Sequence, residues 1–307
     1  MGSQSREVRN DETRCAMLTP MQFQQWCRDL HLPAETVDLI AHIRFSPPAR
    51  RVQGRAGNMS GLFPSKKMGV TIQFESQSVE LGALYLMDHD ESVLELYDQP
   101  HTFKLRYLDQ SGKRMQGHYY TPDFLVVRKN GAVFEEWKTE EELCTLAQKQ
   151  PYRYQRGEDG IWRCPPGEEG AQSIGLSLRV CSSASLPRTY IDNLDFLADY
   201  FIVPPRLPET VVSLIQARIQ ESPGITIAAL LGGPGGLRAN DVYALIALDQ
   251  IFTDLNVSSL RDHFRTRLYA DQATAFAYAQ LGPVSSRLGG QIALPASAPL
   301  STNTRLL

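Results

Sequence analysis

The sequence predicts an α+β protein whose C-terminal part is α-helical. Three observations support this fold class. Apolar residues recur at helical spacing between Glu75 and Asp90, four short strand-like runs follow up to Lys138, and helical spacing returns from about Pro204. With 307 residues, of which 42% are hydrophobic and 21% charged, the chain can bury a sizeable core in one large or two modest domains.

An N-terminal helical segment with a disordered start is expected over residues 1–50. Thr19 suits a helix N-cap and Pro20 the first helical position, so "TPMQFQQWCRDL" predicts one short helix and "PAETVDLIAHIRF" a second. The start, "MGSQSREVRNDETR", has charges but no apolar stretch, so no export signal is indicated. No window approaches the ~18 apolar residues of a membrane span, and we therefore expect a cytoplasmic protein without membrane contact.

Residues 44–69 form a basic stretch without any acidic residue. Prolines and glycines interrupt it, so it predicts a loop or arm and not a helix face. A basic run in isolation is most often a solvated linker. Because the net charge is only −3, affinity for a polyanion would have to come from a local patch such as this one. Its cations are Arg44, Arg50, Arg51, Arg55, Lys66 and Lys67, and the last five are the DNA-binding candidates.

The elements that follow are a helix, antiparallel strands and a second helix. The first helix is expected to start at Glu75. Strands are expected over residues 93–97, 102–107, 119–127 and 133–138, and the second helix from Thr139. Further along, "GEDGIWRCPPGEEGAQ" predicts a turn-rich bridge, "SIGLSLRVCSS" a strand and "YIDNLDFLADYF" a helix.

Residues 204–281 are expected to form a winged-helix-like domain. The segments "PETVVSLIQARIQ", "GITIAALLG" and "RANDVYALIALDQIF" predict three helices, and a short helix is expected in "SSLRDHFRTRLYA". The cluster "GGPGG" lacks the Lys-Ser/Thr ending of a phosphate-binding loop and indicates a turn between helices. Val242, Leu245 and Ile246 could belong to a helix that enters a DNA groove, but their spacing favours the core. The tail, residues 282–307, is rich in Ser, Ala, Pro and Gly and is expected to be disordered.

The five cysteines are odd in number, far apart in the sequence, and lack any C-x-x-C spacing. This pattern predicts reduced thiols and favours neither a zinc site nor a disulfide framework.

The hairpin around Asn130-Gly131 brings ionisable residues together. If these two residues form a type I′ turn, Lys129 pairs with Ala132 and the register places Asp123 directly opposite Lys138. Because side chains alternate along a strand, Glu136 lies on the same face. Buried apolar positions on both sides of the hairpin indicate that both faces are largely covered.

A fourth ionisable residue, Glu80, is expected on the preceding helix. At 100° per residue, Glu80 falls within the arc that contains Ala83, Leu84 and Met87, so it points toward the core. A buried carboxylate without a partner costs several kcal/mol or must be neutralised. Glu75 is a rival, but at the helix start it is explained by the helix dipole.

Two interpretations compete for these residues. In the first, Asp123 and Lys138 are a buried ion pair and Glu135 and Glu136 lie in water. In the second, Glu80, Asp123 and Glu136 supply oxygens to one or two Mg²⁺ ions, for which Mn²⁺ would substitute. The ion would polarise a scissile phosphate and lower the pKa of an attacking water, while Lys138 would hold that water or stabilise developing charge. Only the second interpretation gives Glu80 a role.

These residues resemble the PD-(D/E)xK nuclease pattern: Pro122-Asp123, then Glu136-Trp137-Lys138, with Glu80 before them. The surrounding segments "SGLFPSKKMG", "FESQSVELGALYLMDHDESVLELYDQPHTFKL", "YYTPDFLV" and "EEWKTEEEL" resemble the N-terminal endonuclease domain of the TnsA family, over roughly Val52 to Tyr200. The resemblance implies a restriction-endonuclease-like core, a mixed sheet flanked by helices, over residues 51–203. The family's catalytic Glu, Asp and Lys correspond to Glu80, Asp123 and Lys138, and the position two before the lysine, Gln or an acid in such nucleases, is Glu136.

The resemblance also implies a biological context. TnsA-type proteins cut the 5′ ends of a transposon in double-stranded DNA, while a DDE transposase (TnsB-like) cuts the 3′ ends and an AAA+ ATPase (TnsC-like) regulates both, in the bacterial cytoplasm. A stand-alone restriction or junction-resolving nuclease, or a DNA-bound adaptor with a degenerate site, are the alternatives. Two nearby features have structural explanations as well: Gln99-Pro100 suits a turn as much as an active-site support, and Thr139 and Glu142 suit a capping box.

Overall fold

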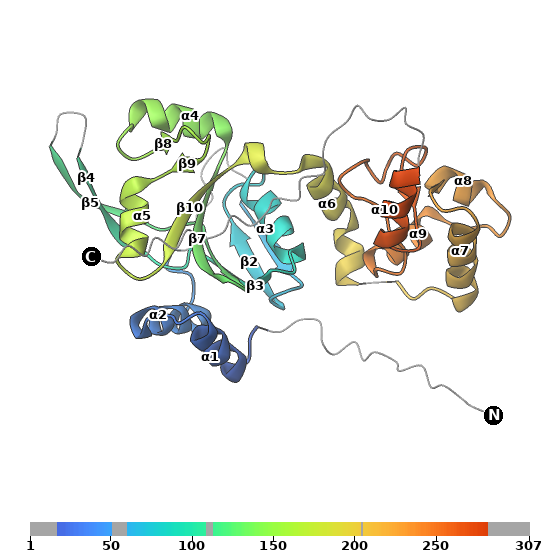
Figure 1. Cartoon of the computed structure of the whole chain (residues 1–307), viewed down its shortest axis with the longest axis horizontal. Coiled ribbons are helices and arrows are strands. Elements are labelled where there is room, and N and C mark those ends of the chain that lie inside the picture. Colours follow the sequence, from blue (N-terminus) through green and yellow to red (C-terminus); the bar gives the residue numbers. More distant parts are fainter. Residues whose placement is uncertain (1–16, 51–59, 109–112, 204, 282–307) are drawn as a thin grey trace. The chain divides into compact units, whose positions relative to one another are not determined.

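The computed structural model describes residues 17–50, 60–108, 113–203 and 205–281 (Figure 1). The chain divides into two compact units. Unit 1 comprises Met1–Pro205 together with Leu255–Arg261, and unit 2 comprises Arg206–Asp254 and Asp262–Leu307. The start and the tail for which we expect disorder, residues 1–16 and 282–307, lie outside the described residues.

Unit 1 is built on a four-stranded mixed sheet with the strand order β10-β7-β6-β3. β3 (Val93–Asp98), β6 (Phe124–Arg128) and β7 (Gly131–Lys138) are antiparallel neighbours, and β10 (Ser177–Ser182) runs parallel to β7. A parallel pair needs a long crossover connection. α4 (Glu140–Lys149), β8 (Gln155–Arg156), β9 (Trp162–Arg163) and α5 (Pro165–Gln172) lie within this crossover. The predicted α+β class with a mixed sheet is confirmed.

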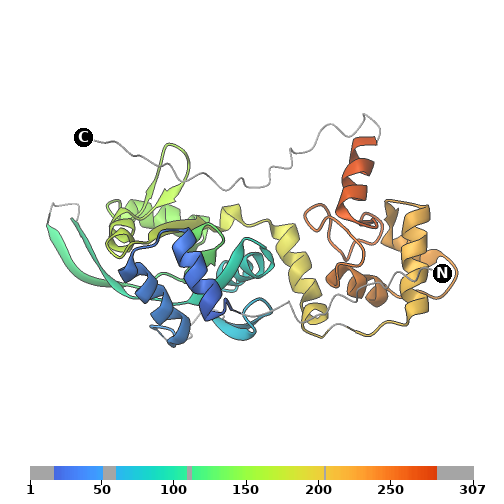
Figure 2. The same ribbon diagram turned by 60° about the horizontal axis from the view of Figure 1, so that its bottom comes forward.

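Helices cover both faces of the sheet (Figures 1 and 2). On one face, Leu125 and Phe134 pack in a core that also takes residues from α1 (Pro20–Asp29), α2 (Ala34–Phe45), α4 and α5. On the other face, Phe124 and Val126 pack with α3 (Glu80–His89), α6 (Arg188–Ile202) and the hairpin of β1 (Gly61–Ser65) and β2 (Val70–Phe74). The prediction that both faces of the hairpin are covered is confirmed.

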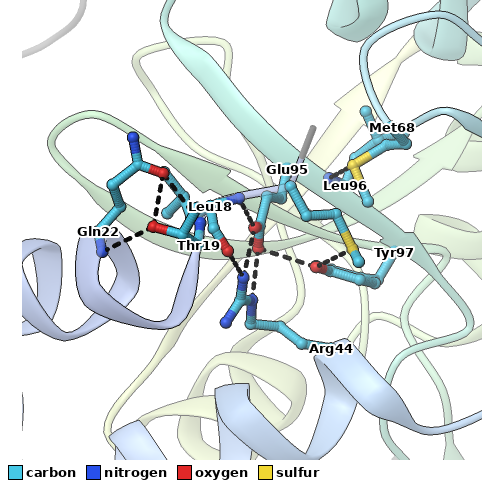
Figure 3. Close-up of polar contacts among 9 residues, drawn as sticks. Leu18, Thr19, Gln22, Arg44, Met68, Glu95, Leu96 and Tyr97 are labelled. Atoms are coloured by element: carbon cyan, nitrogen blue, oxygen red, sulfur yellow. Dashed lines mark hydrogen bonds and ion pairs between the residues drawn. The ribbon is translucent and has the colours of Figure 1, made fainter. Parts of the chain in front are cut away.

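A buried polar cluster joins the N-terminal helices to the sheet (Figure 3). Thr19 caps α1 and accepts a hydrogen bond from Gln22 N, as the sequence predicts. Arg44, near the end of α2, donates from Nε and Nη2 to the two carboxylate oxygens of Glu95 in β3, each at 2.9 Å. Leu18 N and Tyr97 OH donate to the same carboxylate at 2.6 and 2.8 Å. We call Glu95 and its three partners, Leu18, Arg44 and Tyr97, the Glu95 cluster.

Several elements differ from the prediction in unit 1. α3 begins at Glu80 and not at Glu75, because residues 77–79 form a turn. The basic stretch of residues 44–69, expected as a loop or arm, contains β1 and the turn that leads to β2, which its prolines and glycines concealed. The run predicted over 119–127 is two strands, β5 (Arg114–Tyr120) and β6, which belong to different sheets. Part of the supposed turn-rich bridge is α5, whose first positions hold prolines, where their missing N–H groups cost nothing.

Unit 2 is mainly helical. It contains α7 (Glu209–Glu221), α8 (Ile227–Gly232), α9 (Ala239–Ala247) and α10 (Gln272–Leu281), and β11 (Ile225–Thr226) pairs antiparallel with β12 (Arg267–Leu268). Val242, Leu245 and Ile246 of α9 are buried, which confirms their prediction as core residues. The "GGPGG" cluster connects α8 to α9, as predicted.

The short helix predicted in "SSLRDHFRTRLYA" does not form. Turns and β12 occupy this stretch, because pairing with β11 satisfies the backbone of Arg267 and Leu268 in place of a helix. Of the cysteines that the structure describes, Cys27, Cys144, Cys164 and Cys181 are free thiols, in agreement with the prediction. Within the described residues, no helix has the length and apolar character needed to cross a membrane.

Candidate active site

The β6–β7 hairpin brings Asp123 next to Glu136. Arg128 pairs with Gly131 and Phe124 with Glu135, so the next position of the ladder sets Asp123 opposite Glu136. The predicted pairing of Asp123 with Lys138 is wrong. A type I′ turn needs positive φ at both central residues, and Asn130 does not have it. Lys129 and Asn130 form the turn, while Gly131, with φ 150°, opens β7.

The register differs from the predicted one by two residues, so each side chain keeps its predicted face. Asp123 and Glu136 lie on the same side of the hairpin, as expected. Asp123 Oδ2 accepts a hydrogen bond from the backbone N–H of Trp137 at 2.7 Å, which fixes the aspartate against the end of β7. The backbone carbonyl of Asp123 accepts from Gln99 N at 2.8 Å.

Lys138, the last residue of β7, is the cation of the site. Its Nζ lies 2.8 Å from Glu136 Oε1 and 3.8 Å from Glu142 Oε1. Burial opposes the charge of this ammonium, but the carboxylates of Glu136 and Asp123 outweigh burial and hold the pKa of Lys138 well above its ordinary value. Lys138 is therefore a fixed positive charge at neutral pH. Thr139 caps the helix that follows by accepting a hydrogen bond from Glu142 N, which is the Thr139 half of the predicted capping box and limits where Lys138 can point.

Asp123 lies in an unfavourable environment for a negative charge. Burial raises the pKa of Asp123 well above its ordinary value, the charges of Glu136 and Glu80 raise it further, and Lys138 only partly offsets them. Neighbouring carboxylates repel one another when both are ionised, and the single charge of Lys138 does not fully offset this repulsion.

Glu80, the first residue of α3, is buried and belongs to the same electrostatic cluster. Glu80 Oε2 accepts a hydrogen bond from Glu75 N at 2.8 Å. Burial, followed by the charges of Glu75 and Glu136, raises the pKa of Glu80 to about 7, while the Glu75 N–H and Lys138 act in the opposite direction. The structure thus places Glu80, Asp123, Glu136 and Lys138 within electrostatic reach of one another. We call these four residues the carboxylate site.

The neighbouring acidic residues have separate partners. Glu75 lies in a bend after β2, where its carboxylate pairs with Arg50 Nη2 at 2.6 Å. Glu135 was expected in water in one interpretation, but its side chain is fully buried on the other face of β7. Arg128, Arg179 and Trp137 Nε1 all donate to Glu135, and despite burial the two arginines lower its pKa.

In the basic stretch of residues 44–69, several cations have partners within the fold that the sequence does not indicate. Arg44 belongs to the Glu95 cluster, Arg50 pairs with Glu75, and Lys67 Nζ donates to the Asp90 carbonyl at 3.1 Å. Lys66 Nζ lies 5.9 Å from the ring centre of Phe201. The counter-charges come from distant parts of the chain, which a local count of charges cannot reveal. Arg51 and Arg55 lie outside the described residues, and the DNA-binding role of the arm stays a prediction.

Two further residues support the site: Gln99, for which the sequence left a turn and an active-site role open, and Tyr120. Gln99 has a left-handed backbone, φ 43°, is buried, and accepts from Arg50 Nε at 3.2 Å while its own N–H holds the Asp123 carbonyl. Such a conformation is uncommon for a residue other than glycine. Tyr120 is also buried, and its hydroxyl has no hydrogen-bond partner among the described residues. Burial and the charge of Glu136 raise the pKa of Tyr120. No spacing in the sequence singles out Tyr120.

The carboxylate site contains the type of ligand atom that suits a hard divalent cation, since Mg²⁺ prefers carboxylate oxygens. A cation would also relieve the mutual repulsion that raises the pKa values of Asp123 and Glu80. In the part of the chain that the structure describes, however, no three acidic, histidine or cysteine side chains already converge as a metal centre. Glu136 is held by Lys138, and Glu80 by the Glu75 N–H.

Comparison with protein families provides independent information about this region. Residues 90–159 match the family model described as the TnsA-like endonuclease N-terminal domain. This segment is TnsA-like. The TnsA-like segment contains Asp123, Glu136 and Lys138, whereas Glu80 precedes it. Among curated proteins, none matches the chain.

Proposed function

We propose that the chain is the metal-dependent DNA endonuclease subunit of a heteromeric transposase. It would hydrolyse the phosphodiester bonds at the 5′ ends of a transposon during cut-and-paste transposition. The observation that supports this most is the excess of negative charge in the carboxylate site. Three carboxylates share a single lysine there, within and beside the TnsA-like segment.

In this proposal Asp123, Glu136 and Glu80 hold Mg²⁺, and Mn²⁺ substitutes for it. The bound ion would supply Lewis-acid chemistry, polarising the scissile phosphate and lowering the pKa of the attacking water. Asp123 is oriented by the N–H of Trp137 and, through its carbonyl, by Gln99. Lys138 stays protonated, so its role is electrostatic: it stabilises the negative charge that develops on phosphate oxygens and does not act as a general base.

The partners are part of the proposal. A DDE transposase (TnsB-like) would cut the 3′ ends of the transposon, and an AAA+ ATPase (TnsC-like) would regulate the complex in the bacterial cytoplasm. Unit 2 would be a winged-helix-like contact domain, an interpretation that the order of α7, β11, α8, α9 and β12 supports. These partners follow from the TnsA-like segment and not from a contact surface.

A DNA-bound adaptor with an inactive site is the second candidate. It is favoured by the absence, within the described residues, of three donors that already converge on a metal. A stand-alone restriction or junction-resolving nuclease is the third. The need for a partner separates this third candidate from the proposal, because a stand-alone nuclease would cut DNA without the transposase.

The test is cleavage of DNA that carries the transposon ends, in Mg²⁺ or Mn²⁺, with and without the partner DDE transposase (TnsB-like). We expect 5′-end cleavage only when both proteins are present. Asp123→Ala should abolish it while folding and DNA affinity are largely kept, and Asp123→Asn, which retains the side-chain size, should do the same.

The matched control is Asp192→Asn, which changes an exposed carboxylate of α6 and should leave cleavage unchanged. Robust 5′-end cleavage by the folded Asp123 variants would overturn the assignment of the site. Cleavage without the transposase would instead favour a stand-alone nuclease, and no cleavage by any form of the chain would favour the adaptor.

A further inference from the structure

The β4–β5 ribbon is a separate two-stranded sheet in unit 1. β4 (Phe103–Leu108) and β5 pair antiparallel and join no other strand among the described residues. Both views of the molecule show the ribbon projecting past α5 (Figures 1 and 2). The ribbon does not contribute to the four-stranded sheet, so its projecting part needs another explanation.

One face of the ribbon is anchored in unit 1. Leu105 is fully buried, and the ring of Phe103 lies 5.3 Å from that of Tyr120 and 6.1 Å from that of Phe134, measured between centroids. A Cβ atom added to Gly170 of α5 would lie 2.6 Å from the Phe103 ring, so the helix packs tightly on this face. The anchoring fixes which side of the ribbon faces outward.

The outward face carries positive charge and an aromatic ring. Lys104 and Arg106 are exposed there, on the side of β4 opposite Leu105. Tyr119, the partner of Lys104 in the ladder, is 71% exposed, and Lys104 Nζ lies 5.2 Å from its ring centre. The sequences of β4 and β5 contain three Lys or Arg residues and no acidic residue. We call Lys104, Arg106 and Tyr119 the ribbon face.

The ribbon face lies close along the chain to the carboxylate site. β5 ends at Tyr120, and Thr121 and Pro122 lead directly to Asp123. At ~3.3 Å per residue, Tyr119 lies within about 13 Å of Asp123. Lys104, its partner one strand spacing of ~5 Å away, lies within about 18 Å, and Arg106, two residues further along β4, within about 25 Å. A turn of B-DNA spans about 34 Å, so a duplex cut at the carboxylate site can contact the ribbon face within the same turn.

We propose that the ribbon face is a duplex DNA contact that positions the substrate at the carboxylate site. Lys104 and Arg106 pair with backbone phosphates, and Tyr119 supplies a hydroxyl donor and an apolar ring beside them. A two-stranded β-ribbon has the width that the major groove admits. This inference rests on the proposed nuclease function and adds to it the surface that holds the DNA flank.

The test is the salt dependence of binding by the full chain to a fluorescent 40-base-pair duplex of mixed sequence, in EDTA to prevent cleavage. Each phosphate contact contributes about 0.9 to the slope of log K against log salt. Lys104→Gln with Arg106→Gln should therefore lower the slope by about 2 and weaken binding roughly tenfold at moderate salt. The melting temperature should not change, because both side chains are exposed.

The matched control is Lys129→Gln with Lys149→Gln, which removes two exposed cations of unit 1 outside the ribbon. An unchanged slope in the ribbon variant, or an equal loss in the control, overturns the ribbon proposal while the nuclease function stands. Loss of transposase-dependent cleavage without a change of slope also overturns it, because the face would then contact a protein. If the wild-type chain neither binds this duplex nor cleaves transposon ends, the proposed function fails as well.

Discussion

Glu135 and Glu136 are neighbours on β7, both buried, and they lie on opposite faces of the sheet in different electrostatic surroundings. Glu135 meets Arg128, Arg179 and Trp137, so its carboxylate is more than balanced and its pKa is lowered despite burial. Glu136 shares Lys138 with Asp123 and Glu80, whose pKa values are raised. On the same strand, therefore, the charge of Glu135 is neutralised by its partners, whereas Glu136 belongs to a site with more carboxylates than cations.

The Glu95 cluster resembles the surroundings of Glu135 (Figure 3). Glu95 receives two hydrogen bonds from Arg44 and one each from Leu18 N and Tyr97 OH. Because its partners satisfy the buried charge of Glu95, the burial of this carboxylate needs no functional explanation. The comparison teaches that burial alone does not mark a functional carboxylate; an unbalanced set of buried charges does.

Removing Arg44 from the Glu95 cluster should have the largest effect on the free energy of unfolding. Arg44→Met leaves Glu95 buried without its cation, and breaking a buried pair in this way typically costs about 3–5 kcal/mol. The free energy of unfolding from urea denaturation should fall by that amount. The expected loss depends on the Arg44 and Glu95 side chains being 3% and 0% exposed.

The control is Arg50→Met, because the Arg50–Glu75 pair is largely solvated, with side chains 47% and 27% exposed. An exposed ion pair contributes about 0–1 kcal/mol, so this variant should be nearly neutral. Equal losses in the two variants would show that the Glu95 cluster is not the stabilising contact that its geometry indicates.

Removing a carboxylate from the carboxylate site should instead raise the free energy of unfolding. The raised pKa of Glu80, about 7, means that the folded chain binds a proton more tightly than the unfolded chain. The stability from protonated Glu80 is fully present below its ordinary pKa of 4.5 and is lost as the pH rises to about 7. Glu80→Gln should therefore be the more stable form above pH 7, by up to about 3 kcal/mol.

The measurement is thermal unfolding in EDTA between pH 4.5 and pH 8, with Glu158→Gln, at an exposed position, as the control. The wild type and Glu80→Gln should converge toward pH 4.5 and separate above it. A Glu80→Gln variant that is less stable than the wild type at pH 8 would contradict the imbalance of charge.

The faces of the β6–β7 hairpin were predictable from the sequence because side chains alternate strictly along a strand. Its register was not, because it depended on the φ of Asn130, which no local pattern determines. Placing Glu80 toward the core was correct although the helix begins five residues later than predicted, since the apolar arc belongs to the turns that do form.

The balance of charges was the least predictable feature. Glu135 meets Arg128 from the other strand of its own hairpin, but it also meets Arg179 of β10, 44 residues away. Glu95 meets Arg44 of α2, 51 residues away. The last two pairs join segments that are distant in sequence. In the same way, the basic arm has its counter-charges elsewhere in the fold. A resemblance to nucleases indicates which residues to compare, but only the packed structure shows which carboxylates are already neutralised.

Binding of Mn²⁺ by the full chain at pH 8, followed by calorimetry and thermal unfolding, tests the central claim most directly. We expect saturable binding that stabilises the fold, by about 2.7 kcal/mol at a hundredfold excess over the dissociation constant. Asp123→Asn should abolish it, and Asp192→Asn should not. Absence of Mn²⁺ binding by the wild type, or equal binding by the Asp123 variant, would contradict a metal-dependent carboxylate site.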